Sequence, residues 1–178
     1  MTNPAGLELV WIEPEALLST PVLSGFRYWD TLRASRAWPR REELNPRQMI
    51  GLLNYMSLIR VVEDGKDFET RIVGDVMVQA FSVPVQHRKL SEIAQDSPRL
   101  GALAFPLFQR ILAEGKPLAW RQHSGRDSTH VVFTDSEVVL LPLGHSTIDH
   151  ILCFGVHHLS VGPVVARAEL SMAQHHHS

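Results

Sequence analysis

The chain has 178 residues, of which 44% are apolar, and a net charge of −2 at pH 7. This length predicts one domain with a proper core, and the near-neutral charge gives no electrostatic case for binding nucleic acid. A single cysteine excludes an intramolecular disulfide framework, and no apolar run approaches the roughly 20 residues of a membrane span. We therefore expect a soluble cytoplasmic protein with no secretory signal and no membrane span.

Residues 1–20 mix acidic, proline and apolar residues without a clear period, so we expect them to form an N-terminal arm. The first helix is predicted over 21–37. Phe26 and Trp29 lie on its apolar stripe, and Pro39 should end it near the preceding residue.

Strands and helices then alternate in blocks rather than one by one. Two strands at 56–63 and 68–73 are predicted to form an antiparallel hairpin. A helical crossover follows, in which Pro106 should kink or split the longest helix. Three more strands lie within 118–159. Segregated strands indicate an α+β fold and argue against a parallel nucleotide-binding sheet.

The chain contains three short motifs in a particular order and spacing. They are Tyr28-Trp29…Leu32-Arg33…Arg36…Pro39…Arg41 with Asn45-Pro46, then Arg71-Ile72-Val73-Gly74, then Leu140-Leu141-Pro142-Leu143. On these motifs the chain resembles a PAS-like domain family of uncharacterised alphaproteobacterial proteins, over roughly 23–159. The resemblance implies a five-stranded antiparallel sheet in the spatial order 2-1-5-4-3. We expect helices on one face of this sheet and an N-terminal helical extension. It also implies a sensory or protein-interaction role, but it supplies no established ligand.

One stretch departs from the family pattern. Phe81-Ser82-Val83-Pro84 stands where a glycine-containing stretch is expected, in the crossover where PAS domains differ in what they bind. With this exception, the sequence divides into the arm (1–20), a single PAS-like domain (21–162) and a C-terminal tail (163–178).

The histidines and the cysteine do not form a catalytic or metal-binding pattern. His157 and His158 are adjacent in a predicted strand, so their side chains point to opposite faces. Cys153 and His157 share a face but lie about 13 Å apart, too far to share a zinc ion. A haem would need His87 or His130 aimed into a cavity. We therefore predict no catalytic residue and no metal site, and the cofactor stays unknown.

An antiparallel sheet covered by short, broken helices often leaves a mostly apolar cavity. We expect eight side chains to line it and bind a ligand: Val73, Met77, Phe81, Phe105, Phe108, Phe133, Leu141 and Phe154. The alternative is a filled core with no room for a ligand.

Four residues are candidate contacts for a partner or an anion: Trp29, Arg33, Arg36 and Arg71. Arginine forks match carboxylates and phosphates, and Trp29 could serve as an aromatic anchor between two copies. In the structural alternative, Trp29 packs inside the domain and Arg33 and Arg36 pair with nearby acids or the sheet edge. Arg71 could instead bond backbone carbonyls at a strand end.

The leading hypothesis is a non-catalytic sensory domain that binds a small apolar ligand or a protein partner, with a homodimer as one form of partner. The rival is a small α+β enzyme in which His130 or His123 acts as general base and Asp135 or Asp149 orients it. A third possibility is a dimerisation module without a ligand.

Overall fold

The protein was analysed as a computed structural model that describes residues 8–81, 83–123 and 133–159. It is built on one six-stranded sheet in the order β1-β4-β5-β6-β2-β3, with every neighbouring pair antiparallel. The strands are β1 (Glu8–Ile12), β2 (Met56–Val62), β3 (Asp67–Val73), β4 (Leu118–His123), β5 (Phe133–Gly144) and β6 (Ile148–Leu159). Without β1, the remaining five strands have the expected spatial order, so the predicted α+β fold is confirmed.

The sixth strand, β1, comes from the segment that was expected to form only an arm. It pairs with β4 from Glu8 opposite His123 to Ile12 opposite Ala119. Trp11 stands opposite Trp120, and the two rings meet edge to face with centroids 5.9 Å apart. The N-terminal segment therefore extends the sheet beyond β4 and forms its edge.

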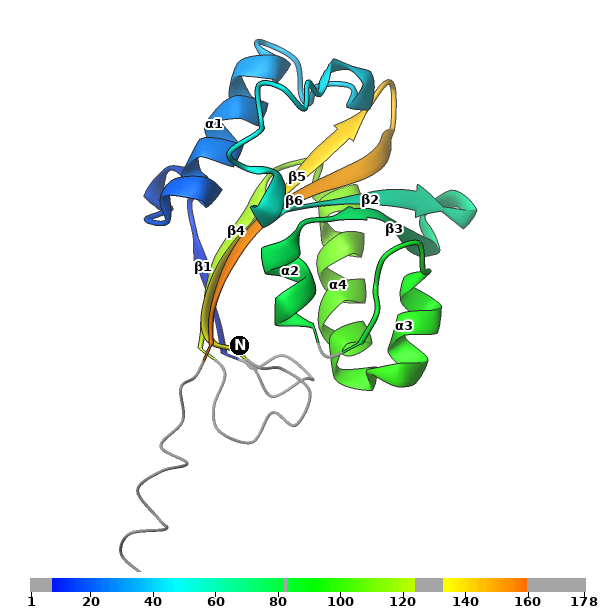
Figure 1. Cartoon of the computed structure of the whole chain (residues 1–178). Helices are drawn as coiled ribbons and strands as arrows, with labels where there is room; N and C mark the ends of the chain where they lie inside the picture. Colours follow the sequence, from blue (N-terminus) through cyan, green and yellow to red (C-terminus); the bar gives the residue numbers. More distant parts are fainter. Residues whose placement is uncertain (1–7, 82, 124–132, 160–178) are drawn as a thin grey trace, which may run out of the picture.

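The helices of the crossover cover one face of the sheet, as expected, and the N-terminal helical extension packs on the other (Figure 1). The helices are α1 (Thr20–Arg33), α2 (Asp75–Ala80), α3 (Leu90–Asp96) and α4 (Pro98–Glu114), with four short 3-10 turns at Pro14–Ala16, Arg41–Glu43, Leu53–Tyr55 and Glu63–Gly65. α1 is the extension, and its apolar stripe is buried against its own face of the sheet, whereas α2, α3 and α4 pack on the opposite face.

α1 is shorter than predicted, because it ends at Arg33 and the next residue, Ala34, has a φ of 52°. The side chain of Arg36 folds back and donates hydrogen bonds to the backbone carbonyls of Leu32 (2.6 Å) and Arg33 (3.2 Å). A basic side chain that bonds the last carbonyls is a common way to end a helix. Pro39 therefore lies beyond the true end.

α1 also lies unusually close to the sheet at one point. A Cβ atom at Gly25 would fall 2.4 Å from Cδ2 of Phe154 on β6. Only a residue without a side chain allows this approach.

α4 continues unbroken for 17 residues through Pro106. Proline removes one backbone hydrogen bond and usually kinks a helix, but Ala104 and Leu107 on either side of it are buried against the sheet. This packing keeps the two halves in one helix, so the expected split does not occur. Gly115, with a φ of 62°, ends the helix in the left-handed conformation that glycine adopts readily.

The two faces of the sheet carry separate cores, because side chains alternate along each strand. Trp29, Leu141 and Phe154 belong to the core under α1. Leu140 and Cys153, the neighbours of Leu141 and Phe154 in the chain, belong to the core under α2, α3 and α4.

Candidate functional site

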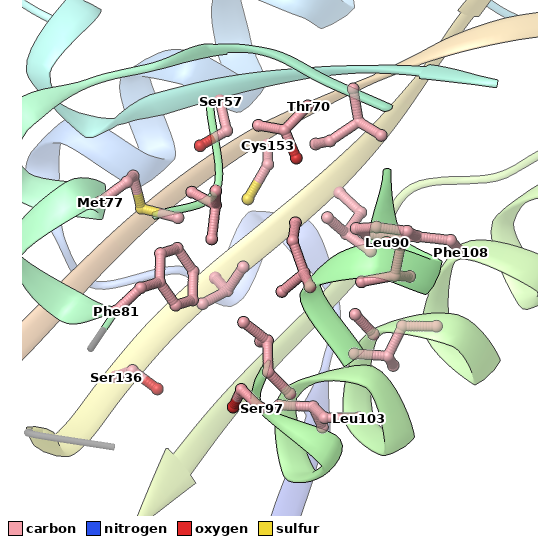
Figure 2. Close-up of a pocket in the computed structure, with 18 of the residues that line it drawn as sticks. Ser57, Thr70, Met77, Phe81, Leu90, Ser97, Leu103, Phe108, Ser136 and Cys153 are labelled. Atoms are coloured by element: carbon pink, nitrogen blue, oxygen red, sulfur yellow. The ribbon is translucent and has the colours of Figure 1, made fainter. Parts of the chain in front are cut away.

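A cavity of about 140 Å³ lies between the sheet and the layer formed by α2, α3 and α4 (Figure 2). Most of its wall is apolar, and the aliphatic and aromatic residues that border it are Ile59, Met77, Phe81, Val83, Val85, Leu90, Ile93, Leu100, Leu103, Ala104, Leu107, Phe108, Trp120, Val138 and Leu140. Its volume is close to the roughly 150 Å³ of an apolar cavity that stays dry and admits benzene. The space therefore suits one small ring or short chain.

The predicted lining residues divide into several groups. Met77, Phe81 and Phe108 border the cavity, and Figure 2 shows Met77 and Phe81 on one side of it and Phe108 on the other. Val73 and Phe105 pack against the same core without bordering the cavity. The side chain of Phe133 lies outside the described residues.

Leu141 and Phe154 are the corrections. Both are fully buried under α1, on the opposite face of the sheet from the cavity. Both residues are apolar, but apolar character does not tell which face of the sheet a residue lies on. The face is decided by the alternation of side chains along the strand. Leu140 and Cys153, one position away, are the residues that border the cavity.

A row of polar residues crosses the sheet at one end of the cavity. Gln122 on β4 pairs in register with Ser136 on β5, which pairs with His157 on β6. All three border the cavity, and the sequence analysis did not predict any of them as lining residues. The available signal was their spacing of two from inward-facing Trp120 and Val138, which becomes readable only when the strand register is known.

Three residues of this wall each carry a fully buried polar atom that has no hydrogen-bond partner within the described part of the chain. These atoms are the indole Nε1 of Trp120, the amide Nε2 of Gln122 and the hydroxyl of Ser136. Each of these residues is at most 5% exposed. A buried polar group without a partner costs about 1–3 kcal/mol, so three of them in one wall are an exception that calls for an explanation.

Two titratable groups in the cavity wall, His157 and Cys153, are held neutral by burial. Burial, together with the smaller effect of the neighbouring charge of His158, lowers the pKa of His157 to about 4. Nε2 of His157 lies 3.3 Å from Sδ of Met77. Burial raises the pKa of Cys153 to about 12, so its thiol stays protonated and is a poor nucleophile.

The residues of the rival enzyme hypothesis do not converge on the cavity. Asp135 borders a separate hollow on the α1 face, and Asp149 lies 2.8 Å from Nδ1 of His150. The side chains of His123 and His130 lie outside the described residues. Among the described residues that border the cavity there is no carboxylate, so the acid–base pair that this hypothesis needs is not formed there.

His87, one of the two residues considered for haem, is exposed and does not border the cavity. Within the described ranges, no group of three or more His, Cys, Asp or Glu side chains is placed to hold a metal ion. Nor does any described helix have the length and apolar character needed to cross a membrane.

Trp29 is buried, with 1% exposure, and its indole N–H donates a 2.8 Å hydrogen bond to the carbonyl of Pro142. It packs inside the domain, so the prediction that it contacts a partner is wrong. It lies on the apolar stripe of α1 that packs against the sheet, so its side chain is not accessible to a partner.

Arg33 and Arg36 make their contacts at the C-terminal end of α1 and just beyond it. Arg33 pairs with Asp30 at 2.7 Å and lies over the ring of Trp29. Arg36 donates to both carboxylate oxygens of Glu43, at 2.8 and 2.9 Å. These contacts favour the structural alternative, with the bonds made to nearby acids rather than to the sheet edge.

Arg71 does not bond a backbone carbonyl in any contact described, but pairs with Glu69 at 2.8 Å. It borders a surface hollow together with Arg41, Arg60 and His150. Its role as an anion contact therefore stays a prediction.

The profile of the PAS domain family matches residues 19–158. The chain belongs to the PAS domain family. The match begins just before α1 and ends within β6, so β1 lies outside the segment that defines this PAS domain. No curated protein and no solved structure matches the chain significantly.

The family match confirms the resemblance noted in the sequence, and it makes the chain a module of a sensory or signalling class. The match names no organism, so an alphaproteobacterial source stays a prediction.

Proposed function

We propose that this PAS domain is a non-catalytic sensor that binds a small, largely apolar ligand in the cavity between the sheet and α2, α3 and α4. The observation that carries the proposal is the largely apolar cavity of about 140 Å³ between the sheet and the layer formed by α2, α3 and α4.

The energetic cost of leaving this space empty supports the proposal. At about 24 cal/mol per Å³, a sealed space of about 140 Å³ would cost on the order of 3 kcal/mol, and the partial opening of this cavity to solvent makes that figure an upper limit. Because domains are stable by only about 5–15 kcal/mol, an apolar occupant that fills the space would recover a useful part of this cost.

A non-catalytic role is supported by the chemistry of the wall. His157 and Cys153 are neutral there, and neither has a carboxylate beside it among the described lining residues. The recipient of the signal would be a protein partner or a second copy of the chain, as the sequence led us to expect.

The test is native mass spectrometry of the protein purified from its own host, compared before and after denaturation. We expect a bound small molecule in the wild type and its loss in Ala104→Phe, which fills the cavity from α4. Ala113→Phe is the matched control, because Ala113 is exposed on the same helix.

A wild-type protein that carries no bound molecule, or an Ala104→Phe variant that is folded and keeps it, would contradict the proposal. Circular dichroism establishes that both variants are folded.

A further inference from the structure

We propose that a surface hollow on the α1 face of the sheet is a second ligand site, which binds the phosphate group of a small phosphate monoester. The hollow is bordered by Arg41, Leu58, Arg60, Arg71, Ile72 and His150. It is separate from the cavity, because Leu58 belongs to the core under α1 and its neighbour Ile59 belongs to the core on the cavity face. The proposal therefore does not depend on the ligand proposed for the cavity.

Two of the arginines are held side by side by one carboxylate. Nη2 of Arg60 lies 2.6 Å from Oε2 of Glu69, and Nη1 of Arg71 lies 2.8 Å from Oε1 of the same side chain. Glu69 is only 15% exposed and does not border the hollow, whereas the two arginine side chains are 49% and 44% exposed. A guanidinium group has five N–H donors, so each arginine keeps donors that a ligand in the hollow can reach.

An irregularity in β3 turns its side chains toward this hollow. Thr70 pairs with Ile59 on β2, and Ile72 pairs with the residue before it, Leu58. Arg71 is thus an extra residue without a partner on β2, and such a β-bulge re-aims the side chains around it. As a result, Thr70 borders the cavity, whereas Ile72 borders the hollow on the opposite face. In a regular strand these two side chains would share a face.

The other two polar residues reach the hollow from neighbouring segments. Arg60 pairs in register with His150 on β6, and the Cβ atoms of such cross-strand partners lie about 4.5–5.5 Å apart. The backbone N–H of Gly144 donates a 3.1 Å hydrogen bond to the carbonyl of Pro39, which holds the segment of Arg41 at the end of the β5–β6 hairpin. The Arg41 side chain is exposed and makes no hydrogen bond or ion pair with any described residue. Its guanidinium group is therefore available to a ligand.

The border of the hollow favours an anion. It contains three arginines and, among the described residues, no carboxylate. Two acids stand nearby but do not border the hollow: Asp149 lies 2.8 Å from Nδ1 of His150, and Glu42 lies 3.4 Å from Nε2 of His145. Arginine forks match the oxygen atoms of phosphates and carboxylates, so both classes of anion suit these side chains.

Between these classes, the arrangement favours a phosphate monoester. A carboxylate has two oxygens, whereas a phosphate monoester has three strong acceptor oxygens and close to two negative charges at neutral pH. Three acceptors suit guanidinium groups that come from three segments of the chain. Ile72 is 43% exposed beside them, so the organic part of the ester can cover an apolar side chain. Free phosphate has no such part.

The experiment compares phenyl phosphate with phenyl sulfate, which has the same shape and the same three terminal oxygens but only one negative charge. Binding to the full chain is measured by isothermal titration calorimetry at neutral pH. We expect phenyl phosphate to bind about fivefold more tightly, because its second charge adds an interaction with exposed cations. Inorganic phosphate should bind more weakly than phenyl phosphate, because it cannot cover Ile72.

Substitutions test whether the binding occurs in this hollow. Arg41→Gln and Arg71→Gln should each weaken the binding of phenyl phosphate about tenfold, since each removes charge-assisted hydrogen bonds. Arg110→Gln is the matched control. Arg110 is also paired with a carboxylate, that of Glu114, and is 42% exposed, but it lies on α4, on the opposite face of the sheet. This variant removes the same charge and should leave the affinity unchanged.

A further control shows whether the phenyl ring enters the cavity instead. Ala104→Phe fills the cavity and should bind phenyl phosphate as the wild type does. In the wild type, the indole N–H signal of Trp120, which borders the cavity, should not move in NMR spectra when phenyl phosphate is added. This second measurement does not depend on whether a variant folds. Loss of binding in a folded Ala104→Phe protein, or a shift of the Trp120 signal, would place the probe in the cavity and overturn the proposal.

Each remaining outcome also decides a point. If no phosphate probe binds, the site itself is overturned. Equal affinity for phenyl sulfate would overturn the doubly charged group, and equal affinity for inorganic phosphate would overturn the ester. Unchanged affinity in Arg41→Gln and Arg71→Gln, or an equal loss in Arg110→Gln, would place the binding elsewhere on the protein. None of these results decides the function proposed for the cavity, which native mass spectrometry tests separately.

Discussion

The two faces of the sheet bury the same kinds of residue, but they differ in whether the buried polar groups have hydrogen-bond partners. On the α1 face, the indole N–H of Trp29 is bonded to the carbonyl of Pro142 at 2.8 Å. On the cavity face, the indole N–H of Trp120 has no partner in the described part of the chain. Both rings are almost fully buried. The difference therefore lies in how their polar groups are satisfied, not in burial.

Two consecutive residues of β5 show the same contrast. The carboxylate of Glu137 accepts hydrogen bonds from the backbone N–H groups of Leu18 (3.0 Å) and Ser19 (2.7 Å) and from Arg121 (2.9 Å). The hydroxyl of Ser136, which is next to it in the strand and on the cavity face, has no hydrogen-bond partner among the described residues. The α1 face therefore satisfies its buried polar groups, whereas the cavity face leaves some of them unpaired.

The largest expected effect is on the completed face. Trp29→Asp should abolish folding, with a loss of more than about 4 kcal/mol, because it removes a buried ring and buries a carboxylate. Urea unfolding followed by circular dichroism measures it. Thr31→Asp, exposed on the same helix, should change stability by less than about 1 kcal/mol. A folded, monomeric Trp29→Asp protein would instead make α1 a contact between subunits.

Glu137→Gln should cost about 2–3 kcal/mol at pH 7, because the amide cannot replace a carboxylate that accepts three hydrogen bonds. Urea unfolding measures this loss, and Glu15→Gln, at an exposed position, is the control and should cost almost nothing.

The effect of Glu137 should also depend on pH. Burial alone would raise its pKa, but the hydrogen bonds from Ser19, Leu18 and Arg121 outweigh burial and lower the pKa below its ordinary value of 4.5. The stabilisation is therefore present above pH 4.5 and is lost as the pH falls through the lower, folded-state pKa. The gap between wild type and Glu137→Gln should narrow on acidification, and a constant gap would contradict this assignment.

On the cavity face, His157 should weaken the fold in a different pH window. Its pKa is lowered from 6.5 to about 4 by burial and by His158, so the unfolded chain takes up a proton before the folded one does. Stability should fall by on the order of 1–3 kcal/mol between these values as the pH drops. NMR titration of the imidazole measures the pKa, and His157→Leu should remove this part of the slope. Titration of His157 near 6.5 would show that it is not buried in solution.

The smallest effect should come from Ser136→Ala. In the ligand-free protein we expect stability to be unchanged or to rise by up to about 1 kcal/mol, because the substitution removes a buried hydroxyl that has no partner. Urea unfolding beside Glu137→Gln makes the comparison within one strand. A loss comparable to that of Glu137→Gln would mean that Ser136 is bonded, and that the two faces are equally complete.

The order of the five central strands could be predicted because two kinds of signal agreed. The segregation of strands around a crossover indicated the α+β class, and the three motifs supplied the order. β1 was missed because Glu8–Ile12 is a five-residue strand flanked by prolines and acids, too short for alternation to be distinguished from an arm. The end of α1 was misplaced because Arg36 caps the helix before Pro39 can act on it.

The cavity could be predicted only in part. The run Val138–Leu143 is apolar at nearly every position, because that part of β5 is buried on both faces, and such a run gives no alternation from which to read facing. Leu141 was therefore placed on the wrong face. Gln122, Ser136 and His157 lie far apart in the chain, and their meeting depends on the pairing register of three strands.

The close approach at Gly25 restricts how α1 can be displaced. A shift of one helical turn in either direction would bring Pro21 or Trp29 opposite the ring of Phe154, where there is room only for a hydrogen atom. The contact between Gly25 and Phe154 thus blocks α1 from sliding along the sheet. Any rearrangement of this helix must be a rotation about that contact or a complete separation from the sheet.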